Sequence, residues 1–200
     1  LYILSCNLGE ILTIFMAPIV GYALPLLPIH LLWINLVTDG FPGLALVAEP
    51  AEKDIMNRPP RPPKENLFAG GLIPRILLTG TLIAIASLFI QWWAVRQGYD
   101  VKTQQTMVFT TLCFVQLGNA LSVRSLYYPI ISSGIIANKG MWATIVLTLG
   151  LQLSIIYIPV LQAIFKTSHI PQLAMTNILI VTFSCIIFIE LLKLGSKKIV

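Results

Sequence analysis

Six long apolar stretches are the feature of this chain that most restricts its fold. They cover approximately residues 1–22, 27–48, 71–95, 105–126, 141–163 and 173–194 of the 200-residue sequence. A helix needs roughly 20 mainly apolar residues to cross a bilayer. Because lipid cannot hydrogen-bond an exposed backbone, such segments must be helices rather than open strands. The sequence therefore predicts an all-α membrane protein, a bundle of six transmembrane helices that forms one domain over residues 1–200.

The composition supports lipid as the surrounding solvent. Hydrophobic residues make up 56% of the chain and charged residues 10%, whereas about a quarter of the residues of a soluble domain are charged. Cys6, Cys113 and Cys185 all fall within predicted spans, without the close spacing of a zinc or redox motif. We expect them to be small packing residues of the bundle.

The basic residues are distributed unequally between the two sides of the predicted membrane. Six spans place ten of them on one side: Lys53, Arg58, Arg61, Lys64, Arg75, Arg124, Lys139, Lys193, Lys197 and Lys198. The other side receives Arg96, Lys102 and Lys166. The positive-inside rule therefore predicts that both termini and the loops 49–70 and 127–140 are cytoplasmic. Topology explains the net charge of +5, so no nucleic-acid partner is expected.

The cytoplasmic loop 49–70 contains four closely spaced prolines and charges of both signs. Prolines prevent a regular helix and favour an extended segment. Two interpretations remain open for it, a solvated linker and a segment that docks onto a cytoplasmic domain.

A break is predicted in the second span, where Gly40 and Pro42 follow Asp39. Proline lacks the N–H that a helix needs and clashes with the preceding turn. Irregular backbone at membrane depth is tolerated where it is buried in protein or lines a cavity. We therefore expect a kink or local unwinding near Asp39, although a plain packing kink is the alternative.

Two of the eight acidic residues, Glu10 and Asp39, lie about ten residues inside a span. An acid at that depth costs roughly 2.5 to 3.5 kcal/mol on insertion scales, so it indicates a function. Asn7 shares a helical face with Glu10, and Asn35 and Thr38 share a face with Asp39. A third acid within a span, Glu190, lies near the end of the last helix and is expected to pair locally with Lys193.

A short connection favours side-by-side packing of the first two spans, which would bring these polar faces together. Carboxylate, amide and hydroxyl oxygens are the ligands of a hard cation such as calcium. Zinc or copper would require sulfur and imidazole, but His30 and His169 lie near span ends and are expected to be interfacial. The alternative is that the polar residues only hold helices together by hydrogen bonds.

Four segments resemble the calcium-transporting P-type ATPases, from their fifth to their tenth transmembrane helix. The segment SCNLGE at 5–10 resembles the ion motif of the fifth helix, and LLWINLVTDGFP at 31–42 that of the sixth. The loop sequence DIMNRPPRPPKE is similar to the cytoplasmic loop that follows in the family, and QLGNALS at 116–122 lies where the eighth helix contributes to the site.

The resemblance implies a set of calcium ligands. Asn7, Glu10, Thr38 and Asp39 would supply one position, and Asn35 and Asp39 would contribute to a second. The second also needs a glutamate and main-chain carbonyls from the family's fourth helix, which this chain does not contain. Gln116 stands where two-calcium members carry a glutamate, so an oxygen ligand is kept without its charge. One or two ions per cycle are both compatible with these residues.

The resemblance also implies the function. The chain would be the ion-binding membrane portion of an ATP-driven pump that moves calcium out of the cytoplasm, with protons returned. It would act as a translocase only with the upstream ATPase domains and helices one to four, in cis or as a separate chain. ATP and magnesium would bind those domains, since the DKTGT phosphorylation segment is absent from these residues.

Three interpretations of the function remain open at this point. Besides a calcium pump, the chain could be a scaffold or subunit derived from one, or part of a P-type pump for manganese or sodium. The expected location is a multi-pass position in a bacterial plasma membrane or an internal membrane.

Overall fold

The computed structural model describes residues 1–49, 71–125 and 138–196, and all regular structure in these ranges is helical. The elements are α1 (Tyr2–Ile19), α2 (Pro28–Trp33), η1 (Ile34–Thr38), α3 (Gly40–Val47), α4 (Leu72–Arg96), α5 (Val101–Val123), α6 (Lys139–Tyr157), α7 (Pro159–Phe165) and α8 (Gln172–Ser196). Six helical segments of the described residues are long and apolar enough to cross a membrane. The prediction of an all-α, multi-pass membrane protein is confirmed.

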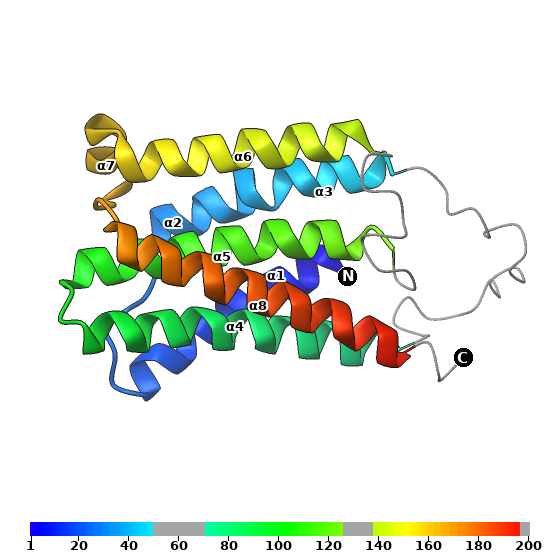
Figure 1. Cartoon of the computed structure of the whole chain (residues 1–200), viewed down its shortest axis with the longest axis horizontal. Coiled ribbons are helices and arrows are strands. Elements are labelled where there is room, and N and C mark those ends of the chain that lie inside the picture. The colour runs from blue at the N-terminus through cyan, green and yellow to red at the C-terminus, as the bar shows by residue number, and fades with distance from the viewer. Residues whose placement is uncertain (50–70, 126–137, 197–200) are drawn as a thin grey trace, which may run out of the picture.

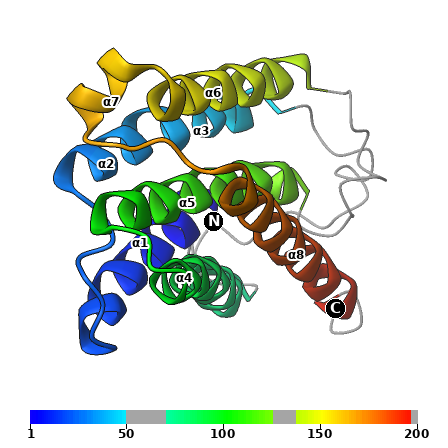
Figure 2. The ribbon, with the colours of Figure 1, turned by 60° about the vertical axis from the view of Figure 1, so that its left-hand side comes forward.

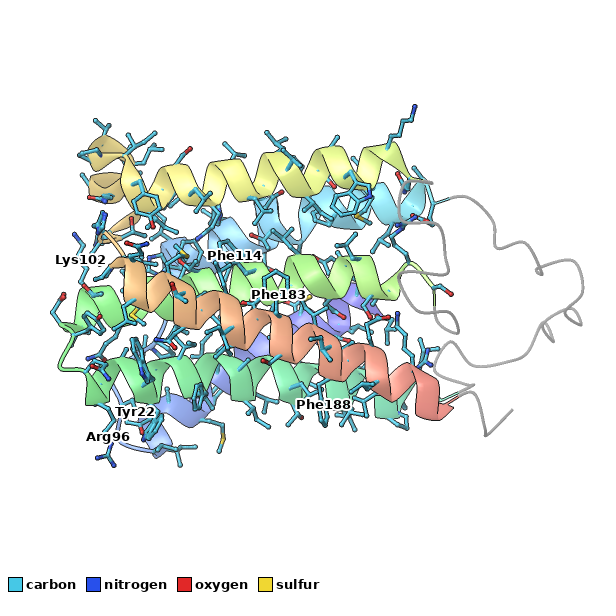
Figure 3. All side chains as sticks on the ribbon, viewed as in Figure 1. Tyr22, Arg96, Lys102, Phe114, Phe183 and Phe188 are labelled. Atoms are coloured by element: carbon cyan, nitrogen blue, oxygen red, sulfur yellow. The ribbon has the colours of Figure 1, made fainter. Side chains whose placement is uncertain are left out.

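The long helices lie side by side as a bundle (Figure 1). The first residues of α1 and the last residues of α8 lie toward the same end, as an even number of spans requires. Figure 3 shows Arg96 and Lys102 at the opposite end. Phe183 and Phe188 of α8 are both exposed on the surface of the bundle. Which end faces the cytoplasm stays a prediction, and loop 50–70 with its basic residues lies outside the described residues.

Helix α5 occupies the centre of the bundle, surrounded by α1, α3, α4, α6 and α8 (Figure 2). It is buried along almost its whole length although it is rich in polar side chains. A helix at the centre does not face lipid, so its polar groups can bond neighbouring helices instead. This position allows α5 to carry buried amides such as Gln116 and Asn119.

Helices α1 and α4 pack most closely at two glycines, Gly9 and Gly80. A Cβ atom built on Gly9 would lie 2.7 Å from Ile83 Cγ2 and 3.3 Å from the Gly80 carbonyl oxygen. One built on Gly80 would lie 2.8 Å from the Leu8 side chain. Small residues at such crossings let two backbones approach within a membrane. The expected partner of the first span was the second span, but α1 packs mainly against α4.

The second span consists of α2, one π-helical turn (η1) and α3. The Asp39 amide donates to the Ile34 carbonyl oxygen, five residues earlier, over 2.8 Å. The predicted irregularity near Asp39 is present, as the π-helical turn that directly precedes this residue. The helix resumes at Gly40 with Pro42 in its first turn, where a missing N–H is tolerated.

Two other boundaries differ from those expected. The predicted span 141–163 is divided, because α6 ends at Tyr157 and Pro159 begins the short helix α7. Helix α5 begins at Val101 rather than near residue 105, since Asp100 caps it by accepting from the Thr103 amide.

His30 is not interfacial as expected, because it is fully buried and stacks on Phe109 with ring centroids 4.5 Å apart. Its ring accepts from the Leu27 amide and donates to the Phe165 carbonyl oxygen. The histidine therefore ties the start of α2 to the end of α7.

Two charged clusters lie at the end of the bundle that carries the chain ends. Lys193 pairs with Glu190 at 2.7 Å, and Ser122 donates to the same carboxylate at 2.5 Å. The local pairing predicted for Glu190 is present. Nearby, Arg124 contacts Glu49 at 2.8 Å with its side chain 1% exposed, which joins the end of α3 to the end of α5.

Candidate ion-binding site

Glu10 is the point at which three helices meet. It lies in the middle of α1 and is 3% exposed. The Gln116 amide of α5 donates to Glu10 Oε1 over 2.8 Å, and the Asn35 amide of η1 makes a longer contact of 3.5 Å to Oε2. The structure therefore brings together three of the six predicted site residues by direct contact.

Asp39 lies at the junction of η1 and α3 and is 4% exposed. The Tyr2 hydroxyl and the Cys6 thiol lie beside its carboxylate. The hydroxyl donates to the Thr38 carbonyl oxygen instead, so both Asp39 oxygens are buried without a hydrogen-bond donor. A buried carboxylate without donors is costly unless it is protonated or meets a cation.

The remaining two predicted residues point elsewhere. The Thr38 hydroxyl is fully buried and donates to Cys113 Sγ of α5 over 3.4 Å. Asn7 donates from its amide to the Ile3 carbonyl of its own helix over 2.9 Å. Neither side chain makes a hydrogen bond to Glu10 or Asp39 among the described contacts.

Buried amide oxygens add to the unpaired carboxylate. Gln116 Oε1 and Asn119 Oδ1 accept no hydrogen bond, and both residues lie on α5 with at most 1% of their surface exposed. Amides normally find partners when they are buried. Two carboxylates and several amide oxygens form an oxygen-rich interior, which suits a hard cation better than a soft one.

A groove lies beside Asp39 on one side of the bundle. Its volume is about 380 Å³. The residues that line it come from α1, η1 and α3: Ile3, Asn35, Asp39, Gly40, Gly43, Leu44 and Val47. The groove lies next to the polar interior, while the Asp39 carboxylate oxygens themselves are buried.

Histidine and cysteine do not complete a metal centre in the described ranges. No group of three or more His, Cys, Asp or Glu side chains in the described parts of the chain is placed to hold a metal ion. Cys6, Cys113 and Cys185 are free and buried, in agreement with their expected packing role. Any cation held here would depend on the two carboxylates and on neutral oxygens.

Two residues of this region were missed by sequence reasoning, Tyr2 and Asn119. The proline at position 42 indicates a free carbonyl at Thr38, four residues earlier, but not which side chain donates to it. Asn119 lies three residues after Gln116, on the same helical face, and that spacing was a usable signal.

Comparison with known proteins identifies the family of this chain. The family described as "Cation transporting ATPase, C-terminus" matches residues 23–195. A calcium-transporting ATPase 1 of Bacillus cereus is 35% identical over 215 residues, covering 99% of this chain and 24% of that protein. The calcium-transporting ATPase of Bacillus subtilis is 38% identical over 168 residues, covering 83% of this chain and 19% of that protein.

A human relative shows the same relationship. The calcium-transporting ATPase type 2C member 1 of Homo sapiens is 32% identical over 190 residues, covering 95% of this chain and 21% of that protein. The chain thus spans about a quarter or less of the length of these relatives. It belongs to the family of cation-transporting ATPase C-terminal regions.

Proposed function

We propose that this chain is the ion-binding membrane portion of an ATP-driven calcium pump that moves calcium out of the cytoplasm. The observation that carries the proposal is Asp39, whose two buried carboxylate oxygens have no donor. Glu10 lies close enough to add a second negative charge to the same interior. A divalent cation would offset both charges, and the names of the relatives favour calcium.

Asp39 would contribute to every ion position, with Glu10, Asn35 and Gln116 around it. Asn7 and Thr38 would join after a rotation of their side chains, since both now bond elsewhere. The open groove beside Asp39 would receive the helix that supplies the missing ligands. ATP and magnesium would act through domains outside these residues, which the greater length of the relatives implies.

Proton countertransport would use the same two carboxylates. When calcium leaves, Glu10 and Asp39 would remain as neighbouring buried acids, and protonation would remove their mutual repulsion. Protons bound there would be carried back as the site reopens toward the cytoplasm. This role needs no further titratable group.

The test is calcium-45 binding to the intact pump, with manganese and sodium as competitors. Asp39→Asn keeps the shape of the side chain and removes its charge, so binding should weaken by roughly a hundredfold, or about 2.7 kcal/mol. Glu10→Gln should weaken binding where the first position is used. Asp100→Asn makes the same chemical change at an exposed helix cap and should leave binding unchanged.

The competing functions predict other outcomes. A native protein that binds no ion, with Asp39→Asn indistinguishable from it, would mean that the polar cluster only joins helices, as in a scaffold derived from a pump. Binding that manganese or sodium displaces more readily than calcium would reassign the transported ion.

A further inference from the structure

Asn119 is a buried amide of α5 that the proposed site does not use. It is 1% exposed, and its Oδ1 accepts no hydrogen bond. Its Nδ2 donates to Cys6 Sγ of α1 over 3.7 Å. One end of the amide is therefore held in place while the carbonyl end is free.

Asn119 and Gln116 each form a side-chain contact between α5 and α1, and these two contacts are called rungs. Gln116 reaches Glu10, and Asn119 reaches Cys6, which lies one turn before Glu10. The helices run in opposite directions (Figure 1), so the rungs follow one another along the bundle. In both rungs an amide nitrogen donates to α1, and in both the amide oxygen has no partner.

The free oxygens of the two rungs can serve one ion. Side chains three residues apart on a helix are neighbours, with Cβ atoms about 5–6 Å apart. Calcium needs six to eight oxygen ligands, and neutral carbonyls are common among them. The described site offers two carboxylates and few neutral oxygens, so another buried amide oxygen three residues from Gln116 meets a need.

We propose that Asn119 Oδ1 is a further oxygen ligand of the transported cation, next to Gln116 and on the side of Glu10 nearer the chain ends. This inference rests on the proposed function, because it assigns a residue to the same site. Cys6 acts as the anchor that turns the amide, and it does not contact the ion. Leaving a buried acceptor unpaired is costly, and on α5 both Gln116 Oε1 and Asn119 Oδ1 are buried without a donor.

The experiment measures calcium-45 binding to the intact pump, with manganese as a competitor, for the native protein and four variants. Asn119→Ala removes the oxygen and should raise the Kd for calcium by about tenfold. Asn119→Asp keeps the shape and adds a charge, so it should lower the Kd and change the manganese-to-calcium ratio. Cys6→Ala removes only the anchor and should change the Kd by less than about threefold.

Asn177→Ala is the matched control, because Asn177 of α8 bonds only to the Leu173 carbonyl of its own helix among the described contacts. It should bind calcium as the native protein does. If Asn119→Ala does not fold, the nearly isosteric Asn119→Asp decides the question through the Kd and the ion ratio.

Several results would overturn the inference. If both Asn119 variants keep the native Kd and ion ratio while Asp39→Asn abolishes binding, Asn119 is not a ligand and the proposed function stands. If Asn119→Ala binds calcium and manganese as the native protein does but unfolds more readily, the amide only joins two helices. If the native protein binds no ion, the proposed function and this inference both fail.

Discussion

The Tyr2 hydroxyl donates a hydrogen bond of 3.0 Å to the main-chain carbonyl oxygen of Thr38. That carbonyl cannot receive the usual helical donor, because the residue four positions later is Pro42, which has no N–H. A side chain from α1 thus replaces the backbone donor that the proline removes. The bond holds the backbone of η1 directly before Asp39, so it fixes the position of the central carboxylate.

Replacing Tyr2 tests how much this hydrogen bond stabilises the fold. Tyr2→Phe removes the hydroxyl and leaves a buried carbonyl without a partner, which should lower the free energy of unfolding by about 1–3 kcal/mol. Chemical unfolding in detergent micelles measures the change. Tyr157→Phe makes the same change in a side chain that is 42% exposed and should have little effect.

A double-mutant cycle with Pro42→Ala tests the mechanism. Alanine restores the N–H that can bond the Thr38 carbonyl, so Tyr2→Phe should cost less in the Pro42→Ala background than in the native protein. The difference should be at least about 0.5 kcal/mol. Equal costs in both backgrounds would mean that Tyr2 stabilises the bundle through its ring alone.

The close crossing of α1 and α4 predicts that one added methyl group at Gly9 lowers the stability of the protein. Gly9→Ala would place a Cβ against Ile83 and close to the Gly80 backbone, which cannot move easily. Overpacking of this kind lowers the free energy of unfolding by roughly 1–3 kcal/mol. If α1 tilts away from α4 to relieve the clash, Glu10 moves with it. Thermal stability in detergent should fall, whereas Gly150→Ala, which meets nothing within 4 Å, should not lower it. A Gly9→Ala protein as stable as the native one would refute the close packing.

The cap that Asp100 forms at the start of α5, outside the membrane spans, should make the stability of the protein depend on pH. The Thr103 side chain, which donates to the carboxylate over 2.5 Å, lowers the pKa of Asp100 below its ordinary value, and the Thr103 amide also bonds it. A lowered pKa means that the capping contribution is present above the unfolded pKa of about 3.9. It is lost as the pH falls through the lower folded value.

The measurement is the midpoint of thermal unfolding between pH 7 and pH 3, compared with Asp100→Asn. The amide can still accept from Thr103 but does not titrate, so the variant should lose less stability than the native protein on acidification. Parallel curves would show that the Asp100 charge does not stabilise the start of α5.

Features of the fold that depend on one segment alone could be predicted from the sequence. Apolar length is a local property, so the six spans were predictable, and so were the buried acids Glu10 and Asp39. The partners of each helix were not, because they depend on shape. Gly9 and Gly80 allow α1 and α4 to pack closely, so α1 contacts α4 rather than mainly the next span, as had been expected. The π turn before Asp39 and the donor from Tyr2 are tertiary effects of the same kind.

Part of the candidate site could be predicted from the types of residue in the spans. Asn35 was chosen because it shares a helical face with Asp39, and Gln116 because its segment resembles the eighth helix of the family. Both contact Glu10. Asn119 was missed although it lies three residues after Gln116 on the same helical face, because its unpaired oxygen is visible only in the structure. Asn7 and Thr38 share the expected helical faces, but their side-chain rotamers direct them to other partners.

Gln116 provides the sharpest test of how charge is balanced at the site. Gln116→Glu would replace a donor to Glu10 by a third carboxylate, so the ion-free protein should lose stability through repulsion. Bound calcium would offset the added charge, so the rise in the thermal midpoint on adding calcium should be larger than in the native protein. Thermal unfolding with a chelator and with saturating calcium measures both effects.

The matched control is Gln105→Glu, since Gln105 is partly exposed and donates to the Leu24 carbonyl oxygen away from the acids. Its calcium-dependent shift should equal that of the native protein. If Gln116→Glu destabilises the protein equally with and without calcium, the ion does not reach Gln116. The neutral amide would then be a helix-joining group, and the ion would be held by Asp39 without the α5 oxygens.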